Sequence, residues 1–282
     1  MKSAIEHFSW YLNESNEIRK NDGWRWLIYR ILKKLMLPDH PYYSKYNSDR
    51  PHYEYIVETA AQQASNLGYN EISVIEFGVA GGSGLLHLEK IANYIQQDYD
   101  LEIEVYGFDT GVGLPNSQNV YDLPYFWRQG HYSMDVESLE SRLNSANLIL
   151  GLLNETVEDF ISTYNPSPIA GIIIDLDYYS STVDALKILD CNDDLILPRV
   201  PIYFDDVVSG RPPALMIQQH GELKAIKEYN ESDMCGTIGK LQFRTGENRV
   251  PRPNRQYCYH RFNHFKYTQY ISEENKELPL TS

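Results

Sequence analysis

The chain has 282 residues, of which 42% are hydrophobic and 23% are charged. This length is enough for one large core with additions, but not comfortably for two full domains. The formal net charge of −14 argues against a nucleic-acid partner, because proteins bind phosphate backbones with an excess of Lys and Arg. We therefore expect a small-molecule substrate, and the sequence leaves open whether the chain forms homo-oligomers.

The three cysteines, Cys191, Cys235 and Cys258, form no C-x-x-C pair, and their odd number suits a reducing compartment better than a disulfide framework. The sequence has no run of apolar residues long enough to span a membrane, and its first residues lack the apolar segment of a signal peptide. We therefore expect no membrane span and a cytoplasmic location.

Residues 1–50 are predicted to form a helical N-terminal extension or cap. Apolar side chains recur there at helical spacing until Pro38 and Pro41 end the pattern. The same segment is basic within an acidic protein, which is typical either of a cap helix with solvated charges or of a helix that contacts a membrane surface or a partner. Of these two interpretations, the pattern favours the cap.

From residue 71 onward, apolar segments rich in β-branched residues alternate with segments of helical periodicity. The expected strands are 72–77, 103–108, 147–151, 169–175 and 200–204. The expected helices between them are 83–98, 135–145, 154–164 and 181–190. A further helix is expected over 222–230, and two more strands that could close the sheet as an antiparallel hairpin are expected over 239–243 and 255–262.

This alternation predicts the α/β fold class, with a Rossmann-like, doubly wound and mostly parallel sheet of about seven strands in a domain over residues 51–270. Residues 271–282 are polar and without periodicity, so they are expected to form a loose tail. Because open parallel sheets bind ligands beyond the carboxyl ends of their strands, the residues that follow each strand are the candidates for chemistry.

The first expected strand leads into a glycine-rich segment. Glu76 lies near the end of the strand, and Gly78, Ala80 and Gly82 follow it before the next helix. Glycines allow a tight turn and bring a ligand close to the backbone at the N-terminus of a helix. No register of the segment gives the G-x-G-x-x-G of a dinucleotide site, which argues against a nicotinamide cofactor. The segment instead resembles the first motif of class I S-adenosylmethionine-dependent methyltransferases, and this resemblance implies that the four residues bind the cofactor.

The second expected strand is followed directly by Asp109. A carboxylate at this point can accept two hydrogen bonds from ribose hydroxyls, as the acid after the second strand does in nucleotide-binding folds. We therefore expect Asp109 to belong to the same cofactor site, with an ordinary surface aspartate as the alternative.

Two pairs of acidic residues accompany the ends of the fourth and fifth expected strands: Asp175 with Asp177, and Asp205 with Asp206. These strands should be neighbours in the sheet, so the four carboxylates should lie within reach of one site. Like charges repel by roughly 4 kcal/mol per close pair at an effective dielectric of about 20, so a positive group should lie among them. A hard divalent cation such as Mg²⁺ prefers oxygen ligands of this kind. For Asp177, the alternative is a cap on the helix that follows.

Three strings resemble those of the macrocin O-methyltransferase family: GFDTGVGLP at 107–115, IDLDYYSSTVDAL at 174–186 and YFDDV at 203–207. This family consists of metal-dependent enzymes that methylate sugar hydroxyls of natural products. The resemblance covers residues 72–207 and implies S-adenosylmethionine as the methyl donor. Position by position, it implies metal binding by Asp175, Asp205 and Asp206, with Asp177 as a second candidate for the first of these positions.

The long loop over residues 110–134 is rich in aromatic residues, and we expect it to form one wall of the acceptor pocket. Methyl transfer is an in-line displacement, so the acceptor oxygen must be aligned and its proton removed. A metal bound at Asp175 would orient the acceptor hydroxyl and lower its pKa. Asp177 or His131 would act as the general base, and the sequence does not choose between them.

The function expected from the sequence is therefore methylation of a hydroxyl on a small polar or sugar-containing metabolite, with S-adenosylmethionine and Mg²⁺. Two other classes remain open from the sequence: a nicotinamide-dependent oxidoreductase on a similar sheet, and a non-catalytic donor-binding partner subunit.

Overall fold

The computed structural model describes residues 45–46, 48–117, 119–208, 214–232, 235–243 and 250–272. The helix expected within residues 1–50 lies outside the described residues. The same is true of the C-terminal tail expected over 271–282, except for its first two residues.

A seven-stranded sheet forms the centre of the described part of the chain, in the order β3-β2-β1-β4-β5-β7-β6. Strands β1 to β5 run parallel, and β7 pairs antiparallel with both β5 and β6. The prediction of a doubly wound, mostly parallel sheet that ends in an antiparallel pair is thus confirmed. The strands are β1 Glu71–Phe77, β2 Glu102–Asp109, β3 Asn147–Leu150, β4 Ile169–Ile174, β5 Arg199–Phe204, β6 Thr237–Lys240 and β7 Gln256–His260.

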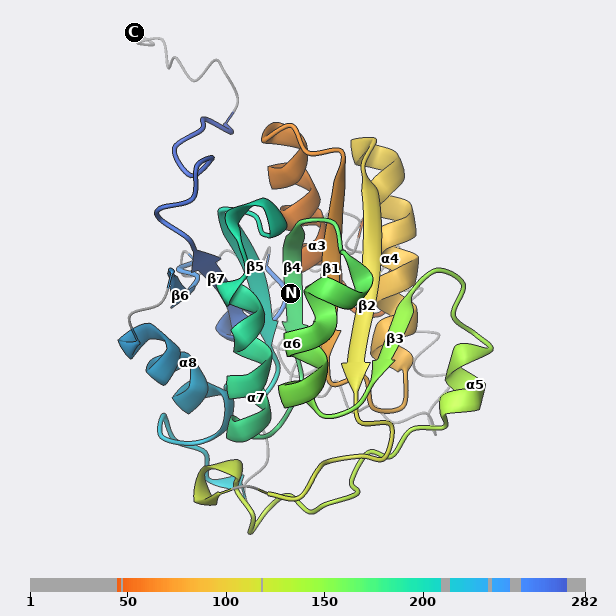
Figure 1. Cartoon of the computed structure of the whole chain (residues 1–282), viewed down its shortest axis with the longest axis vertical. Helices are drawn as coiled ribbons and strands as arrows, with labels where there is room; N and C mark the ends of the chain where they lie inside the picture. The colour runs from red at the N-terminus through yellow and green to blue at the C-terminus, as the bar shows by residue number, and fades with distance from the viewer. Residues whose placement is uncertain are drawn as a thin grey trace, which may run out of the picture. The chain divides into compact units, whose positions relative to one another are not determined.

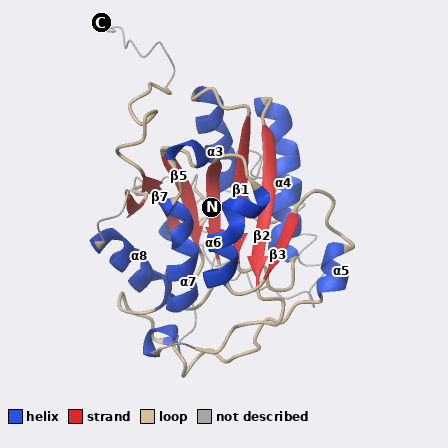
Figure 2. Cartoon of the chain, in the orientation of Figure 1, coloured by secondary structure: helices blue, strands red, loops and turns tan. Residues whose placement is uncertain are grey.

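Helices cover both faces of the sheet, as Figures 1 and 2 show. On one face α3 (Pro51–Asn66) packs against α4 (Ser83–Tyr99), and on the other α6 (Leu153–Tyr164), α7 (Tyr179–Leu186) and α8 (Gly221–Glu231) pack side by side. Every residue of β4, whose sequence is IAGIII, is buried. Such a run of mostly β-branched residues is typical of a central strand covered on both faces.

Helix α3 was not expected from the sequence, although its pattern is clear in retrospect. Pro51 occupies its first turn, where the missing N–H is not needed. Tyr53, Ile56, Val57 and Ala60 then recur at helical spacing, and all four are buried. The helix therefore belongs to the core of the domain, and its first turn lies close to the ends of the strands that carry the acidic residues.

Helix α5 is shorter than expected, because it spans Val136–Glu140 rather than 135–145. The buried carboxylate of Glu89 on α4 accepts hydrogen bonds from the backbone amides of Asn144 and Ala146, each at 2.8 Å, and from the amide of Ser145. These amides would otherwise bond within a continued helix. Glu89 thus helps to end the helical pattern and turns the chain into β3.

The other short helices are one-turn 3-10 segments. The helix expected over 181–190 divides into α7 and η3 (Lys187–Asp190). The other segments lie in loops: η2 Val120–Asp122, η4 Asp193–Leu195 and η6 Pro253–Arg255.

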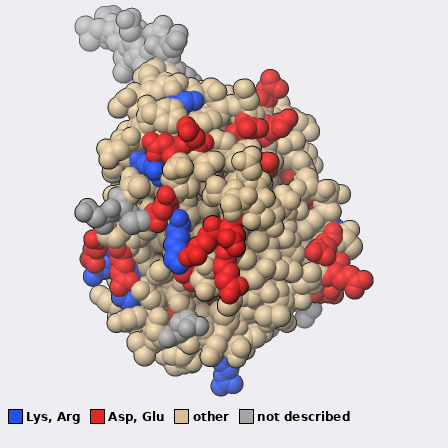
Figure 3. All heavy atoms as spheres, in the orientation of Figure 1, with Lys and Arg blue, Asp and Glu red and all other residues tan. Residues whose placement is uncertain are grey.

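Among the charged side chains on the face seen in Figure 3, acidic ones are more common than basic ones, in keeping with the net charge of −14. Among the described helices, none is both long enough and apolar enough to cross a membrane.

Replacing Glu89 by Gln should lower the free energy of unfolding by about 1.5 to 3 kcal/mol, because three backbone amides lose a charged acceptor. Urea unfolding would measure this difference. Glu140→Gln, at an exposed position on α5, is the matched control and should change stability by less than about 0.5 kcal/mol. Equal stability of the two variants would show that Glu89 does not hold this turn.

Candidate active site

The carboxyl ends of the parallel strands lie together at the lower edge of the sheet in Figure 1, where the long loop after β2 also runs. All the candidate residues lie at the ends of β1, β2, β4 or β5 or in the loops that follow them at this edge.

The glycine-rich loop lies directly against the end of β4. Gly78 has a φ of +88°, and a Cβ at this position would lie 1.9 Å from the carbonyl oxygen of Asp175. Only glycine can occupy such a position without moving the backbone. Gly82 has a φ of +82° and precedes α4, and a Cβ there would lie 2.4 Å from the side chain of Leu139. The loop expected to bind the methyl donor and the backbone of Asp175 are thus in contact.

The carboxylate of Asp109 joins the loops that follow β1 and β2. Its Oδ2 accepts hydrogen bonds from the amides of Val79 (3.1 Å) and Ala80 (2.9 Å), and its Oδ1 accepts one from the amide of Gly111 (2.7 Å). Ala80 has a φ of +48°, so this part of the loop has an unusual backbone conformation that Asp109 stabilises. Asp109 thus has a role in shaping the loop in addition to the ribose contact expected from the sequence.

Glu76 on β1 is buried, with 1% of its surface exposed. Its Oε1 accepts a hydrogen bond of 2.6 Å from the hydroxyl of Tyr53 on α3, whereas its Oε2 has no partner within the described chain. Burial raises the pKa of Glu76 to about 7, although the Tyr53 hydrogen bond and the charge of Arg50 oppose this shift. A buried carboxylate oxygen without a partner suits a cationic group of a ligand.

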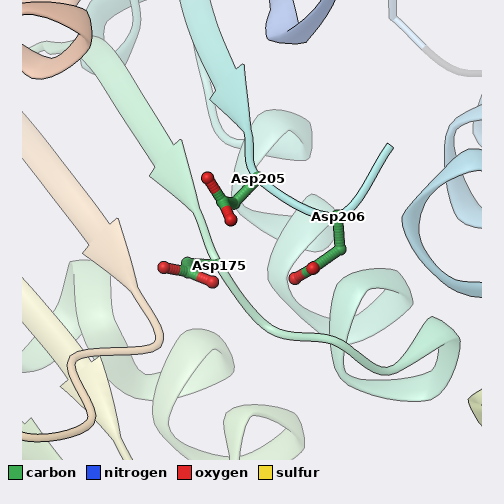
Figure 4. A group of neighbouring side chains, drawn as sticks. All are labelled: Asp175, Asp205 and Asp206. Atoms are coloured by element: carbon green, nitrogen blue, oxygen red, sulfur yellow. The ribbon is translucent and has the colours of Figure 1, made fainter. Parts of the chain in front are cut away.

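Three carboxylates converge at the ends of β4 and β5. Oxygen atoms of Asp175, Asp205 and Asp206 all lie within 4.8 Å of one another, and Figure 4 shows the three side chains around a common space. This juxtaposition is the one that the order of the strands predicted. The donor set consists entirely of oxygen atoms, as hard cations such as Mg²⁺ prefer.

The electrostatics of this cluster favour a bound cation. Burial, followed by the charges of Asp205 and Asp206, raises the pKa of Asp175 well above its usual value. Burial, followed by the charges of Asp177 and Asp205, likewise raises the pKa of Asp206. Because each raised pKa reflects the free energy needed to hold a negative charge there, a divalent cation among these oxygens would stabilise the ionised forms.

Two further acids adjoin the cluster. Glu222, in the first turn of α8, is fully buried and accepts hydrogen bonds from the amides of Asp206 (2.9 Å) and Leu176 (3.4 Å). It was not expected from the sequence, and its only signal there is an acid at the start of a helix. Asp177 is 8% exposed, and its amide donates to Oδ2 of Asp206 at 3.2 Å.

Arginines on the segment before β7 neutralise part of this charge. Oδ1 of Asp205 accepts hydrogen bonds from Arg252 (2.8 Å), from Arg255 and from the hydroxyl of Tyr203. These three contacts all use the same oxygen of Asp205. The charge of Arg50 also acts on Asp175 and Asp205, so the negative charge of the cluster is partly offset.

The long loop after β2 forms a lobe, residues 114–131, that is closed at its base. Leu114 donates from its amide to the carbonyl of His131 and accepts from the amide of Gly130, each at 2.8 Å. The side chain of His131 is exposed at this base, with its ring 6.0 Å from that of Tyr132. His131 thus lies on the lobe as expected, and its role as a base stays a prediction.

Three contacts fix this lobe to neighbouring elements. Oδ1 of the buried Asp122 accepts a hydrogen bond of 2.8 Å from the amide of Ser180 at the start of α7. The Lys224 ammonium on α8 lies 4.2 Å from the centroid of the Tyr121 ring, and the Tyr125 hydroxyl donates to the carbonyl of Ala214 at 2.7 Å. Asp122, rather than Asp177, therefore caps the helix that follows the acid cluster.

Comparison with known proteins agrees with this fold. No protein-family model matches the chain, and no curated protein matches it in sequence. Among solved structures, however, its fold is similar to that of two methyltransferases.

Two solved structures illustrate this likeness. The calicheamicin methyltransferase CalS11 has a TM-score of 0.50 and 19% sequence identity, with 74% of this chain and 78% of that chain covered. The O-methyltransferase NovP has a TM-score of 0.50 and 15% identity, with 75% of this chain and 80% of that chain covered. At such low identity the likeness concerns the fold, and the activity must be argued from the site.

Replacing Glu76 by Gln should change how stability depends on pH. The pKa of Glu76 is about 7 in the folded protein and near 4.5 in an unfolded chain, so the folded state holds a proton that the unfolded state has released between these values. The free energy of unfolding of the wild type should therefore fall as the pH rises from 4.5 to about 7. The Gln variant lacks this fall, which should amount to about 3 kcal/mol at roughly 1.4 kcal/mol per pKa unit.

Urea unfolding across this pH range would test the Glu76 prediction. Glu102→Gln, at an exposed position on β2, is the control and should follow the wild type. Parallel stability curves for the wild type and Glu76→Gln would contradict a buried carboxyl with a raised pKa.

Replacing Asp122 by Asn should loosen the lobe, because the amide of Ser180 loses its charged acceptor. We expect faster amide exchange over residues 114–131 and at Ser180, with a loss of about 1 to 3 kcal/mol in local stability, measurable by hydrogen–deuterium exchange. Asp135→Asn is the matched control, since Asp135 caps the exposed helix α5 through the amide of Ser138. Unchanged exchange in Asp122→Asn would mean that the lobe is held by its aromatic contacts alone.

Proposed function

We propose that this chain is an S-adenosylmethionine-dependent O-methyltransferase that uses Mg²⁺ and acts on a hydroxyl of a small polar or sugar-containing metabolite. The observation that carries this proposal is the contact between the glycine-rich loop and the acid cluster, at Gly78 and Asp175. A methyl donor on the loop and an acceptor hydroxyl at the cluster would then be neighbours, as in-line transfer requires.

The donor site would consist of the loop after β1 and the two acids beside it. Gly78, Ala80 and Gly82 supply backbone that a ligand can approach closely, and Asp109 holds that backbone in place. Bound there, the sulfonium of S-adenosylmethionine supplies the methyl group. Glu76, with one unpartnered buried oxygen, suits the ammonium group of this cofactor.

Asp175, Asp205 and Asp206 are the residues that would hold the metal. A divalent cation bound there would act as a Lewis acid toward the acceptor hydroxyl. The protein contributes the geometry: Arg252 and Arg255 fix Asp205, and the backbone amide of Asp177 holds Asp206. Fixed oxygen ligands of this kind need little rearrangement when a cation binds.

Asp177 is the favoured general base, with His131 as the second candidate. The Asp177 amide binds Asp206, so its side chain belongs to the same corner of the site as the proposed metal ligands. A carboxylate there could take the proton from an acceptor hydroxyl aligned with the donor. His131 lies on the exposed lobe and would reach the acceptor from the opposite wall.

The lobe supports a sugar-containing acceptor. Tyr121 and Tyr125 are exposed on it, and flat aromatic faces beside polar groups are typical walls of pockets for sugars and similar polar molecules. The two similar structures, a calicheamicin methyltransferase and an O-methyltransferase, support the proposal of hydroxyl methylation on a small molecule.

Two alternatives differ from this proposal in the ligand or in turnover. A nicotinamide-dependent oxidoreductase would bind NAD in preference to S-adenosylmethionine, although the loop lacks G-x-G-x-x-G. A non-catalytic partner subunit would bind S-adenosylmethionine without turnover. Titration calorimetry with both cofactors, followed by a methyl-transfer assay on a panel of glycosides and sugar nucleotides, would separate the three.

The metal requirement gives the sharpest test. Chelation with EDTA should abolish methyl transfer and added Mg²⁺ should restore it, whereas binding of S-adenosylmethionine should persist without metal. Asp206→Asn should weaken Mg²⁺ more than about tenfold, since even residues that only support a metal ligand contribute about that much. Titration calorimetry would measure both affinities.

The matched control for this test is Asp184→Asn, on α7, where the partly exposed Asp184 pairs with Lys187 at 2.8 Å. This variant should bind Mg²⁺ and turn over like the wild type. Full methyl transfer in excess chelator would overturn the metal-dependent mechanism while leaving donor binding intact.

A further inference from the structure

The start of α3 brings a guanidinium group next to the proposed donor site. Arg50 directly precedes the helix, and its Nη1 donates a hydrogen bond of 3.1 Å to the hydroxyl of Tyr53. The same hydroxyl donates to Oε1 of Glu76 at 2.6 Å. One tyrosine hydroxyl thus joins a guanidinium group on one side to a buried carboxylate on the other.

Arg50 has no carboxylate partner of its own in the described chain. Its side chain is partly buried, yet its contacts there are the Tyr53 hydroxyl and the face of the Tyr53 ring, at 4.9 Å from the guanidinium carbon. The acids Glu76, Asp175 and Asp205 act on it through longer-range charge interactions. A guanidinium has five N–H donors, and among the described residues one of those of Arg50 is used by the Tyr53 hydroxyl, which leaves others to bind an anion.

Glu76 offers the complementary feature. Its Oε2 is buried without a partner, in a side chain that is 1% exposed. Leaving such an oxygen unsatisfied is costly, and a ligand ammonium group would satisfy it. An unpartnered carboxylate oxygen and an unpaired guanidinium, held apart by one hydroxyl, match the two charges that an α-amino acid carries on a single carbon.

Building on the function proposed above, we propose that Arg50, Tyr53 and Glu76 bind the amino-acid end of the methyl donor. Arg50 binds its carboxylate, Glu76 binds its ammonium group, and the Tyr53 hydroxyl fixes the distance between the two. The first turn of α3 is then part of the donor site, although it precedes the glycine-rich loop by more than twenty residues.

The experiment compares two ligands that differ only at the carboxylate: S-adenosylmethionine and decarboxylated S-adenosylmethionine. Titration calorimetry on the full chain gives both affinities. Arg50→Gln should weaken S-adenosylmethionine by roughly 10- to 100-fold, the usual size of a charge-assisted hydrogen bond, and should change the affinity for the decarboxylated ligand by less than about threefold. Arg50→Lys should recover part of the loss, because it restores the charge without the planar fork.

Arg142→Gln, at an exposed position before β3, is the matched control and should leave both affinities unchanged. Circular dichroism would establish that each variant is folded. Tyr53→Phe provides a second line of evidence, since loss of the hydroxyl should weaken S-adenosylmethionine while leaving Mg²⁺ binding at the acid cluster intact.

The outcomes separate the two proposals. If wild type binds both ligands equally well, or if Arg50→Gln weakens both by the same factor, Arg50 does not bind the carboxylate, and the proposed methyltransferase function stands. If wild type binds neither ligand, the proposed function itself fails, and the assignment of Arg50 fails with it.

Discussion

The crowding of carboxylates at the ends of β4 and β5 is the constraint on which the rest of the site depends. Five acids meet there, all at least partly buried, and the charges of neighbouring acids raise the pKa of Asp175, Asp206 and Glu222 beyond the effect of burial alone. Much of the surrounding structure can be understood as compensation for this repulsion. Arginines from the segment before β7 pair with Asp205, and backbone amides from two loops donate to Glu222 and Asp206.

The same constraint links the two halves of the site. The loop after β1 touches the backbone of Asp175, so one packing contact links the position of the acid cluster to that of the loop proposed to bind the methyl donor. Helix α3 reinforces this link through two contacts. The Tyr53 hydroxyl donates a hydrogen bond to Glu76, and the ring centroid of the neighbouring His52 lies 4.7 Å from that of Tyr203. Contacts from Glu76 through Tyr53, His52 and Tyr203 to Asp205 therefore connect the proposed donor site with the acid cluster.

The sequence predicted the sheet and the acid cluster well, because both follow from local patterns. Runs of apolar residues marked the strands, and acids at the ends of β4 and β5 had to converge once those strands were neighbours. The end of α5 and the role of Glu222 could not be predicted, since each depends on a tertiary contact with no periodic signal. Helix α3 is a different case, because Pro51 and the helical spacing of the apolar residues after it are local signals of a helix in the sequence.

The closed base of the lobe after β2 has a consequence for how such a protein can diversify. Because Leu114 bonds to both Gly130 and His131, the two ends of the lobe stay together whatever the length of chain between them. Residues can be inserted, deleted or exchanged within that segment without shifting β2 or the turn toward α5, and the entropic cost of a longer closed loop grows only slowly. Under the proposed function this lobe forms a wall of the acceptor pocket, so changes within it could alter acceptor choice while the acid cluster and the glycine-rich loop keep their positions.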